Sequence, residues 1–163
     1  MADRTLISRM IGAATFDLET FEEVEANESL TGQAALVVFL AAIAEAIGSS
    51  RSGLIAAVGA GIAAIFAWLL WAGITYLIGD KMLGGTATWG ELLRTLGFAQ
   101  APGVFLVLAI IPLLGWAVQA GVALWMLGLG VIAVRQALDF STGKAIATVL
   151  VGWICLTILH AIF

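Results

Sequence analysis

Long stretches without charged side chains limit what this chain can fold into. The clearest covers residues 53–79, where no Asp, Glu, Lys or Arg interrupts the apolar residues. An α-helix of about 20 apolar residues can cross the roughly 30 Å hydrocarbon core of a bilayer. The whole chain is 62% hydrophobic and 11% charged, whereas soluble domains carry about 25% charged residues. The sequence therefore predicts an all-α integral membrane protein.

Five of these stretches are expected to be transmembrane helices. The apolar region that follows residue 98 is too long for one span, so we divide it at Pro112 and Gly115. The third span is then short, and it could be tilted or re-entrant. The resulting layout is a cytoplasmic N-terminal segment, 1–29, and a membrane domain, 30–163, with spans at about 30–48, 53–79, 98–114, 116–138 and 143–163.

The positions of lysine and arginine predict the orientation, because cytoplasmic loops are enriched in these residues. Of the lysine and arginine residues that flank the predicted spans, only Arg51 lies on one side of the membrane. The opposite side carries all the others: Arg4, Arg9, Lys81, Arg94, Arg135 and Lys144. We therefore expect the N-terminus in the cytoplasm and the C-terminus outside.

The N-terminal segment is expected to lie on the membrane surface without crossing it. Apolar residues between positions 5 and 14 fall on one face of a helix, as in amphipathic helices that lie in the interfacial plane. The acids that follow could form a solvated face, the favoured interpretation, or a partner-binding surface: Asp17, Glu19, Glu22, Glu23, Glu25 and Glu28. The net charge of −4 does not indicate a nucleic-acid-binding surface.

The glycine-rich stretch from Gly79 to Gly103 is interpreted as a membrane elbow. A phosphate-binding loop needs Lys directly after its second conserved glycine, and Gly85 occupies that position here. Thr88 and Glu91 have the spacing of a capping box. The apolar residues that follow share one face, with Arg94 and Thr95 expected to face water. This pattern predicts a short interfacial helix between the second and third spans.

Small residues in the second span predict a face for close helix packing. The residues on this face are Gly59, Ala60, Ala63 and Ala64.

A polar cluster is a further hypothesis, at the outer end of the bundle. A carboxylate within a membrane helix is costly and usually finds a partner or a wet cavity. The candidate members are Glu45, Arg51, Gln119 and His160, although separate interfacial residues are the favoured interpretation.

No catalytic, cofactor-binding or metal-binding site is expected. His160 and Cys155 are the only residues of their types, so a Cys/His metal site cannot be built. The Ser, His and acidic residues are too few and too scattered along the chain to predict a Ser–His–acid triad. An enzyme is therefore not expected.

Five segments resemble a known family: "TFEEVE" (20–25), "TGQA" (31–34), "YLIG" (76–79), "TWGELLRTLGFAQAP" (88–102) and "LDFSTGKA" (138–145). They are similar to prokaryotic members of the Yip family, the Ypt/Rab-interacting proteins. The resemblance implies five membrane helices, a cytoplasmic N-terminus and, here, a prokaryotic plasma membrane. Eukaryotic relatives are non-enzymatic organisers that bind Rab GTPases and sister proteins. Their cytoplasmic N-terminal region is longer than residues 1–29, which puts GTPase binding in doubt here.

Two functions follow as hypotheses. The first is a non-catalytic protein that organises membrane lipids, other membrane proteins or further copies of itself through its cytoplasmic face. The candidate interaction residues there are Glu23, Glu25, Trp89, Glu91, Arg94 and Lys144. The second is a small transporter, channel or lipid-moving protein that uses the outer polar residues.

Overall fold

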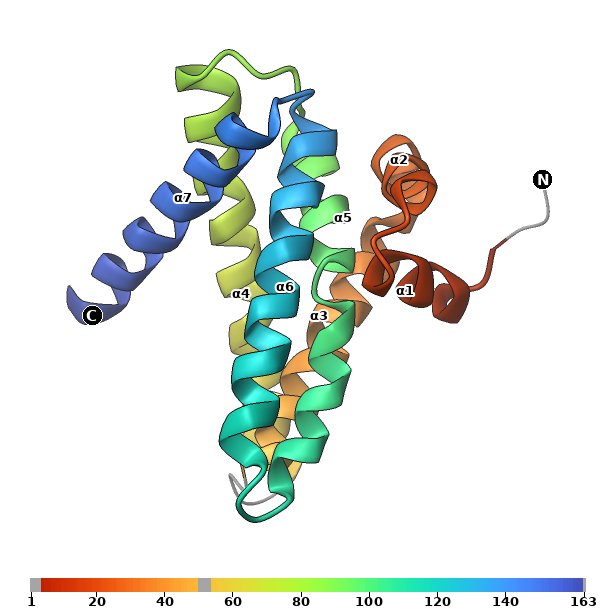
Figure 1. Cartoon of the computed structure of the whole chain (residues 1–163), viewed down its shortest axis with the longest axis vertical. Helices are drawn as coiled ribbons and strands as arrows, with labels where there is room; N and C mark the ends of the chain where they lie inside the picture. The colour runs from red at the N-terminus through yellow and green to blue at the C-terminus, as the bar shows by residue number, and fades with distance from the viewer. Residues whose placement is uncertain (1–3, 50–53, 163) are drawn as a thin grey trace.

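The structure, a computed structural model, describes residues 4–49 and 54–162, and side chains are described up to 154 except at 54 and 153. Short connections join the helices, and the described residues contain no β-strand (Figure 1). The α-helices are α1 (Leu6–Ala14), α2 (Leu18–Ala26), α3 (Thr31–Gly48), α4 (Leu54–Tyr76), α5 (Trp89–Phe98), α6 (Gly115–Ala137) and α7 (Thr142–Ile162). Between them lie the 3-10 turn η1 (Glu28–Leu30), the π-helical η2 (Leu77–Met82) and the 3-10 helix η3 (Ala101–Ile110).

Four helical segments are long and apolar enough to cross a membrane. They cover Glu28–Gly48, Ile55–Met82, Trp89–Ile110 and Gly115–Ala137, and the described part of α7 adds a shorter apolar helix, Thr142–Gly152. The predicted all-α, multi-pass membrane architecture is therefore confirmed, whereas the fifth crossing stays a prediction. The second span continues beyond its predicted end at residue 79, because η2 extends α4 to Met82.

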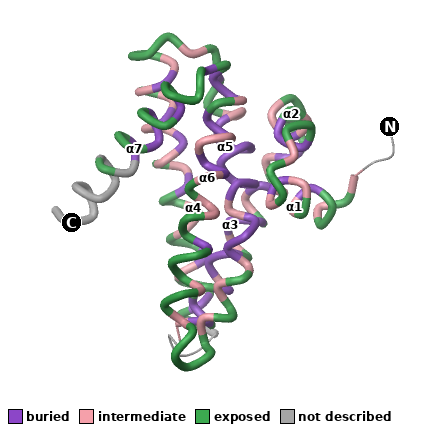
Figure 2. Tube along the Cα trace, in the orientation of Figure 1, coloured by how far each residue is buried: buried purple, intermediate pink, exposed green. Residues whose placement is uncertain are grey.

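The spans run up and down side by side (Figure 1). α3 descends in this view, α4 rises, α5 and η3 descend together, and α6 rises again. α7 leaves the upper end of α6 and leans away from the bundle. α1 and α2 lie to one side of the bundle, where α2 packs against α5 and α6. Buried residues gather along α3 and α5, at the centre of these contacts (Figure 2).

The segment predicted as an interfacial helix is the first half of a candidate span. The capping box of Thr88 and Glu91 is confirmed and fixes the start of α5. However, Arg94 and Thr95 are buried, at 5% and 0% exposure, so the prediction that they face water is wrong. The reason is that α2 covers this face of α5. The helix tightens into η3 close to Pro102, which has no N–H to donate.

The predicted small-residue face of α4 packs within the chain only in part, with Ala64 against the buried core. Gly59 and Ala63 are exposed, Ala60 and Ala64 are half-buried, and a Cβ on Gly59 would meet nothing within 4 Å. α4 instead buries a different face, on which lie Ala57, Gly61, Trp68, Ala72 and Thr75. The sequence could not show which face of α4 packs against other helices, because lipid tails are as apolar as a neighbouring helix and either environment suits small apolar residues.

The tightest helix contact lies between α3 and the α5–η3 segment. A Cβ on Gly97 would lie 2.8 Å from the Cβ of Ala34, and one on Gly103 would lie 2.6 Å from the Cβ of Ala41. At the far end of α3, a Cβ on Gly48 would lie 1.9 Å from the Leu106 carbonyl oxygen. These glycines let the two helices approach closely.

Candidate functional site

The N-terminal helices form a hairpin that is docked on the bundle. Thr5 caps α1 and Asp17 caps α2 through side-chain hydrogen bonds to backbone N–H groups. On the docked side, Phe21 and Val24 of α2 are completely buried. The Trp125 indole on α6 donates to the carbonyl oxygen at the end of α1, at 2.8 Å. This hairpin is thus an integral part of the fold.

An ion pair inside the hairpin joins its two helices. Arg9 of α1 is 4% exposed, and its guanidinium lies 2.7 Å from the Glu23 carboxylate of α2. Arg9 also donates to the Gln33 side chain of α3 at 3.2 Å. Arg4 adds a second cation beside Glu23, at 3.6 Å. Glu23, a candidate for partner binding, is therefore already engaged within the chain.

Arg94 connects the hairpin to the bundle. Its Nε donates to the carbonyl oxygens of Val24 at 2.8 Å and Glu25 at 3.1 Å, and its Nη2 donates to Glu25 as well. These acceptors lie in the last turn of α2, where carbonyl groups lack intrahelical partners. A cation there also compensates the negative end of the helix dipole. Arg94 of α5 thereby caps the C-terminal end of α2, which lies about 70 residues earlier in the sequence.

Carboxylates from three separate segments gather around this junction. Burial raises the pKa of Glu25, and the nearby charges of Glu91, Asp139 and Glu22 raise it further, while Arg94 acts in the opposite direction. Glu22 and Asp139 are exposed, and Glu25 and Glu91 are half-buried. We call these four residues the acidic surface. The sequence did not indicate that Asp139 belongs with the acids of α2, because the two are distant in sequence. They come together only because α2 packs against α5 and α6.

The other cytoplasmic candidates lie elsewhere. Trp89 is 46% exposed, with its indole beside Gly73 of α4. Lys144 donates to the Leu83 carbonyl oxygen at 3.3 Å and lies 5.1 Å from the centre of the Phe140 ring. Neither side chain is part of the acidic surface.

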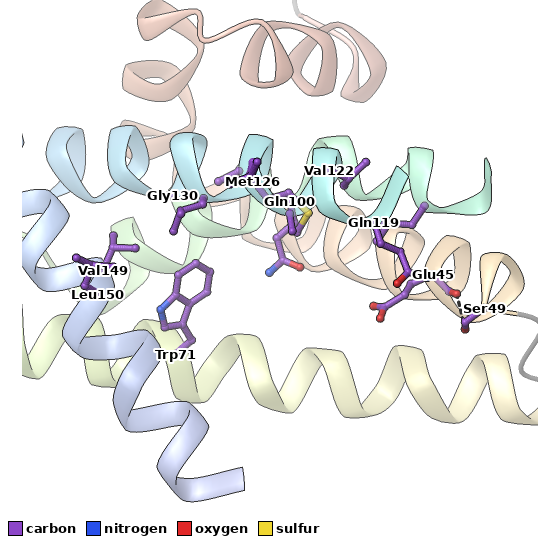
Figure 3. A pocket seen from close by; sticks show the side chains of 15 residues that line it. Glu45, Ser49, Trp71, Gln100, Gln119, Val122, Met126, Gly130, Val149 and Leu150 are labelled. Atoms are coloured by element: carbon purple, nitrogen blue, oxygen red, sulfur yellow. Dashed lines mark hydrogen bonds between the residues drawn. The ribbon is translucent and has the colours of Figure 1, made fainter. Parts of the chain in front are cut away.

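A cavity of about 670 Å³ lies within the membrane bundle. Residues of α3, α4, α6 and α7 contribute to its wall, and Figure 3 shows their side chains. Glu45 and Gln119, both exposed, lie beside each other at one end of it, so the structure brings together two of the predicted outer residues. Arg51 and the His160 side chain lie outside the described residues.

Polar side chains deeper in the wall of this cavity, Gln100 and Trp71, were missed by the sequence analysis, as was Ser49 beside Glu45. The half-buried Gln100 lies between the Glu45 end and Trp71 (Figure 3). The Trp71 indole N–H is buried without a hydrogen-bond partner, and so is the hydroxyl of nearby Thr75. Gln100 lies between α5, which ends at Phe98, and η3, which begins at Ala101. Because the helix type changes there, helical periodicity did not indicate which way the Gln100 side chain would point.

The fold and these two sites define a multi-pass helical membrane protein with a docked N-terminal hairpin and a cavity among its spans. In the described part of the chain, no group of three or more His, Cys, Asp or Glu side chains is arranged to hold a metal ion.

The chain belongs to the Yip1 domain family, whose family model matches residues 12–163. The matched region begins at the last turn of α1 and includes α2, the acidic surface and the cavity. Comparison with curated proteins and with solved structures gave no match.

Proposed function

We propose that this chain is a non-catalytic scaffold that holds partner membrane proteins through its cytoplasmic face, in a prokaryotic plasma membrane. The observation that supports this proposal is the acidic surface, which is built from α2, α5 and the turn after α6, with Arg94 joining α2 to α5. A surface fixed in this way needs little ordering when a partner binds, which lowers the cost of association.

Charge complementarity indicates the chemistry of the partner. Glu22 and Asp139 are exposed carboxylates beside the half-buried Glu25 and Glu91. Lysine and arginine are enriched in the cytoplasmic loops of membrane proteins. A basic juxtamembrane segment of another membrane protein therefore fits this surface, and so does a basic loop of a second copy. Complementary charges of this kind mainly favour encounter and specificity.

This proposal requires that the docked hairpin lies in the cytoplasm and that α7 crosses the membrane. With Cys155 replaced by Ser, we expect an impermeant maleimide to label intact cells that carry a Cys added after Phe163. It should spare Ser141→Cys, in the loop before α7, until the membrane is permeabilised. Equal labelling of both positions in intact cells, or the reverse pattern, would contradict this orientation.

Partner binding is tested by neutralising the acidic surface without changing side-chain shape. We expect Glu22→Gln combined with Glu91→Gln to reduce the recovery of co-purified membrane proteins by about tenfold, since about 1.4 kcal/mol of binding energy gives that factor. The measurement is quantitative mass spectrometry of proteins cross-linked in native membranes. Gln retains the capacity of residue 91 to accept a hydrogen bond at the start of α5.

The matched control neutralises Glu19 and Glu28, two exposed acids outside the acidic surface. We expect its partner recovery to equal that of the unmodified protein. Equal losses in both double variants would indicate a net-charge effect, and no loss in either would reject the acidic surface as the binding site.

The cavity favours a second candidate function, the handling of a membrane lipid. Polar groups line it at more than one level, from Glu45 and Gln119 to Gln100 (Figure 3). Beyond Trp71 its wall is formed by apolar residues such as Val149 and Leu150. This gradient supports binding of an amphiphile more directly than passage of a polar solute through the bundle.

A further inference from the structure

The cavity among the spans has a polar end and an apolar end. Glu45, Ser49 and Gln119 gather at one end, and Trp71, Val149 and Leu150 lie at the other (Figure 3). Its volume of about 670 Å³ is within the roughly 300–1,000 Å³ of small-molecule sites. All these residues except Ser49, which follows α3, lie on helices expected to be in the membrane. The polar and apolar ends of the cavity therefore match the polar head and apolar chains of an amphiphile.

The apolar part of the wall is open to the surroundings. Leu124, Leu127 and Leu150 line the cavity, yet their side chains are 70%, 43% and 45% exposed. The same three residues line a second, almost entirely apolar cavity of about 330 Å³ between α6 and α7. A ligand with long hydrocarbon chains can therefore place them along α6 and α7 without entering the interior completely.

We propose that this cavity binds the headgroup of a phospholipid that carries a primary amine, such as phosphatidylethanolamine. In this arrangement the ammonium contacts the Glu45 carboxylate. The amide groups of Gln119 and Gln100 donate hydrogen bonds to the phosphate and ester oxygens. The acyl chains leave over Leu124, Leu127 and Leu150.

The charge of the lining selects this headgroup. Glu45 is the only charged residue among the side chains that the structure places in the cavity wall. A carboxylate among membrane helices is costly unless a partner or water compensates it. An anionic headgroup such as phosphatidylglycerol would place a second negative charge beside Glu45, whereas an ammonium group carries the opposite charge. The amine is thus the feature that Glu45 can recognise.

The depth of the site fits a lipid as well. Glu45 lies in the last turn of α3, three residues before its end at Gly48, so it is close to one membrane surface. Lipid headgroups are located at this level. Gln100 lies deeper along the cavity (Figure 3), near the middle of the candidate span Trp89–Ile110, so the headgroup would extend from the surface into the bundle. This site is separate from the acidic surface, and its failure would leave the scaffold proposal unaffected.

The test uses the full-length protein, delipidated in detergent and given equal amounts of phosphatidylethanolamine and phosphatidylglycerol with the same acyl chains. Native mass spectrometry then counts the lipids retained on each molecule. We expect one tightly bound phosphatidylethanolamine, preferred over phosphatidylglycerol by about tenfold. Glu45→Gln should abolish this preference. Glu19→Gln, which removes an exposed acid outside the cavity, should preserve it.

A second pair of variants separates the cavity from lipid that only surrounds the protein. Ala123→Trp places a large side chain in the cavity, and we expect it to lower phosphatidylethanolamine retention by about tenfold. Ala117→Trp, at an exposed site on the same helix outside the wall, should have no effect. Circular dichroism checks that both variants fold. Equal retention of the two lipids by the unmodified protein, or undiminished retention by Ala123→Trp, would overturn the proposal.

Discussion

Replacing Arg94 by methionine should lower the free energy of unfolding by about 3 kcal/mol. Methionine fills a similar space but donates no hydrogen bond, so the carbonyl groups of Val24 and Glu25 would lose their partner at the end of α2. Each buried carbonyl left unsatisfied costs about 1–3 kcal/mol. The hairpin should also become susceptible to proteolysis, because Arg94 connects it to the bundle. Thermal unfolding in detergent and limited proteolysis measure the two effects.

The free energy of unfolding of Arg94→Lys should lie between those of Arg94→Met and the unmodified protein, because lysine retains the charge but not the planar fork of donors. Arg135→Met is the matched control. Arg135 is exposed on α6, so we expect its loss to change stability by no more than about 0.5 kcal/mol. If Arg94→Met were as stable and as protease-resistant as Arg135→Met, Arg94 would not hold α2 in place.

The second large effect is expected for Gly48→Ala, which should cost about 3 kcal/mol. The added methyl group would lie 1.9 Å from the Leu106 carbonyl oxygen and 3.2 Å from the Cβ of Ala109. A backbone oxygen cannot rotate away as a side chain can. α3 and η3 would therefore have to separate along the tightest contact of the fold. Thermal unfolding in a single detergent measures the loss.

Gly59→Ala makes the same chemical change at an exposed position of α4, where the new Cβ meets nothing within 4 Å. Alanine is favoured over glycine in a helix by about 0.5–1 kcal/mol, so this variant should be neutral or slightly stabilised. A similar loss in both variants would show that the close approach of α3 and η3 does not limit stability.

The class of fold could be predicted from the sequence because it depends on local properties. Span length and the absence of charge identify membrane helices whatever their neighbours are. The start of α5 was predictable for the same reason, since Thr88 and Glu91 satisfy each other's backbone groups within a single turn. Family membership was predictable as well, because its motifs are distributed over nearly the whole chain.

The packing faces were not predictable, because they depend on partners that are distant in sequence. Arg94 was expected to face water, since nothing near it in sequence indicates that α2 would cover it. Gly59 and Gly61 share one apolar neighbourhood in α4, but a Cβ on Gly61 would meet Phe39 of α3, whereas one on Gly59 would meet nothing within 4 Å. In a soluble protein polarity would distinguish the two faces, whereas in a bilayer both faces are apolar.

The candidate sites, too, could be predicted only where they depend on the order of the spans and not on how distant helices pack. Glu45 and Gln119 could be assigned to one end of the bundle, because the order of the spans determines which loops lie on the same side. Gln100 and Trp71 could not be added, since their direction depends on the change from α5 to η3 and on the packing of α4. The acidic surface likewise required Asp139 to be placed next to α2.

The length of α4 with η2 exceeds the thickness of the membrane it crosses. Its uncharged part, Ile55 to Gly79, is about 25 residues, or roughly 37 Å at 1.5 Å per residue, against about 30 Å of hydrocarbon. Such a mismatch is relieved by tilt or by local thickening of the bilayer. The paired charges of Asp80 and Lys81 directly above it, 2.7 Å apart, resist being drawn into the lipid. Bilayer thickness should therefore determine the angle of α4, and with it the height at which the loop before α5 stands above the membrane.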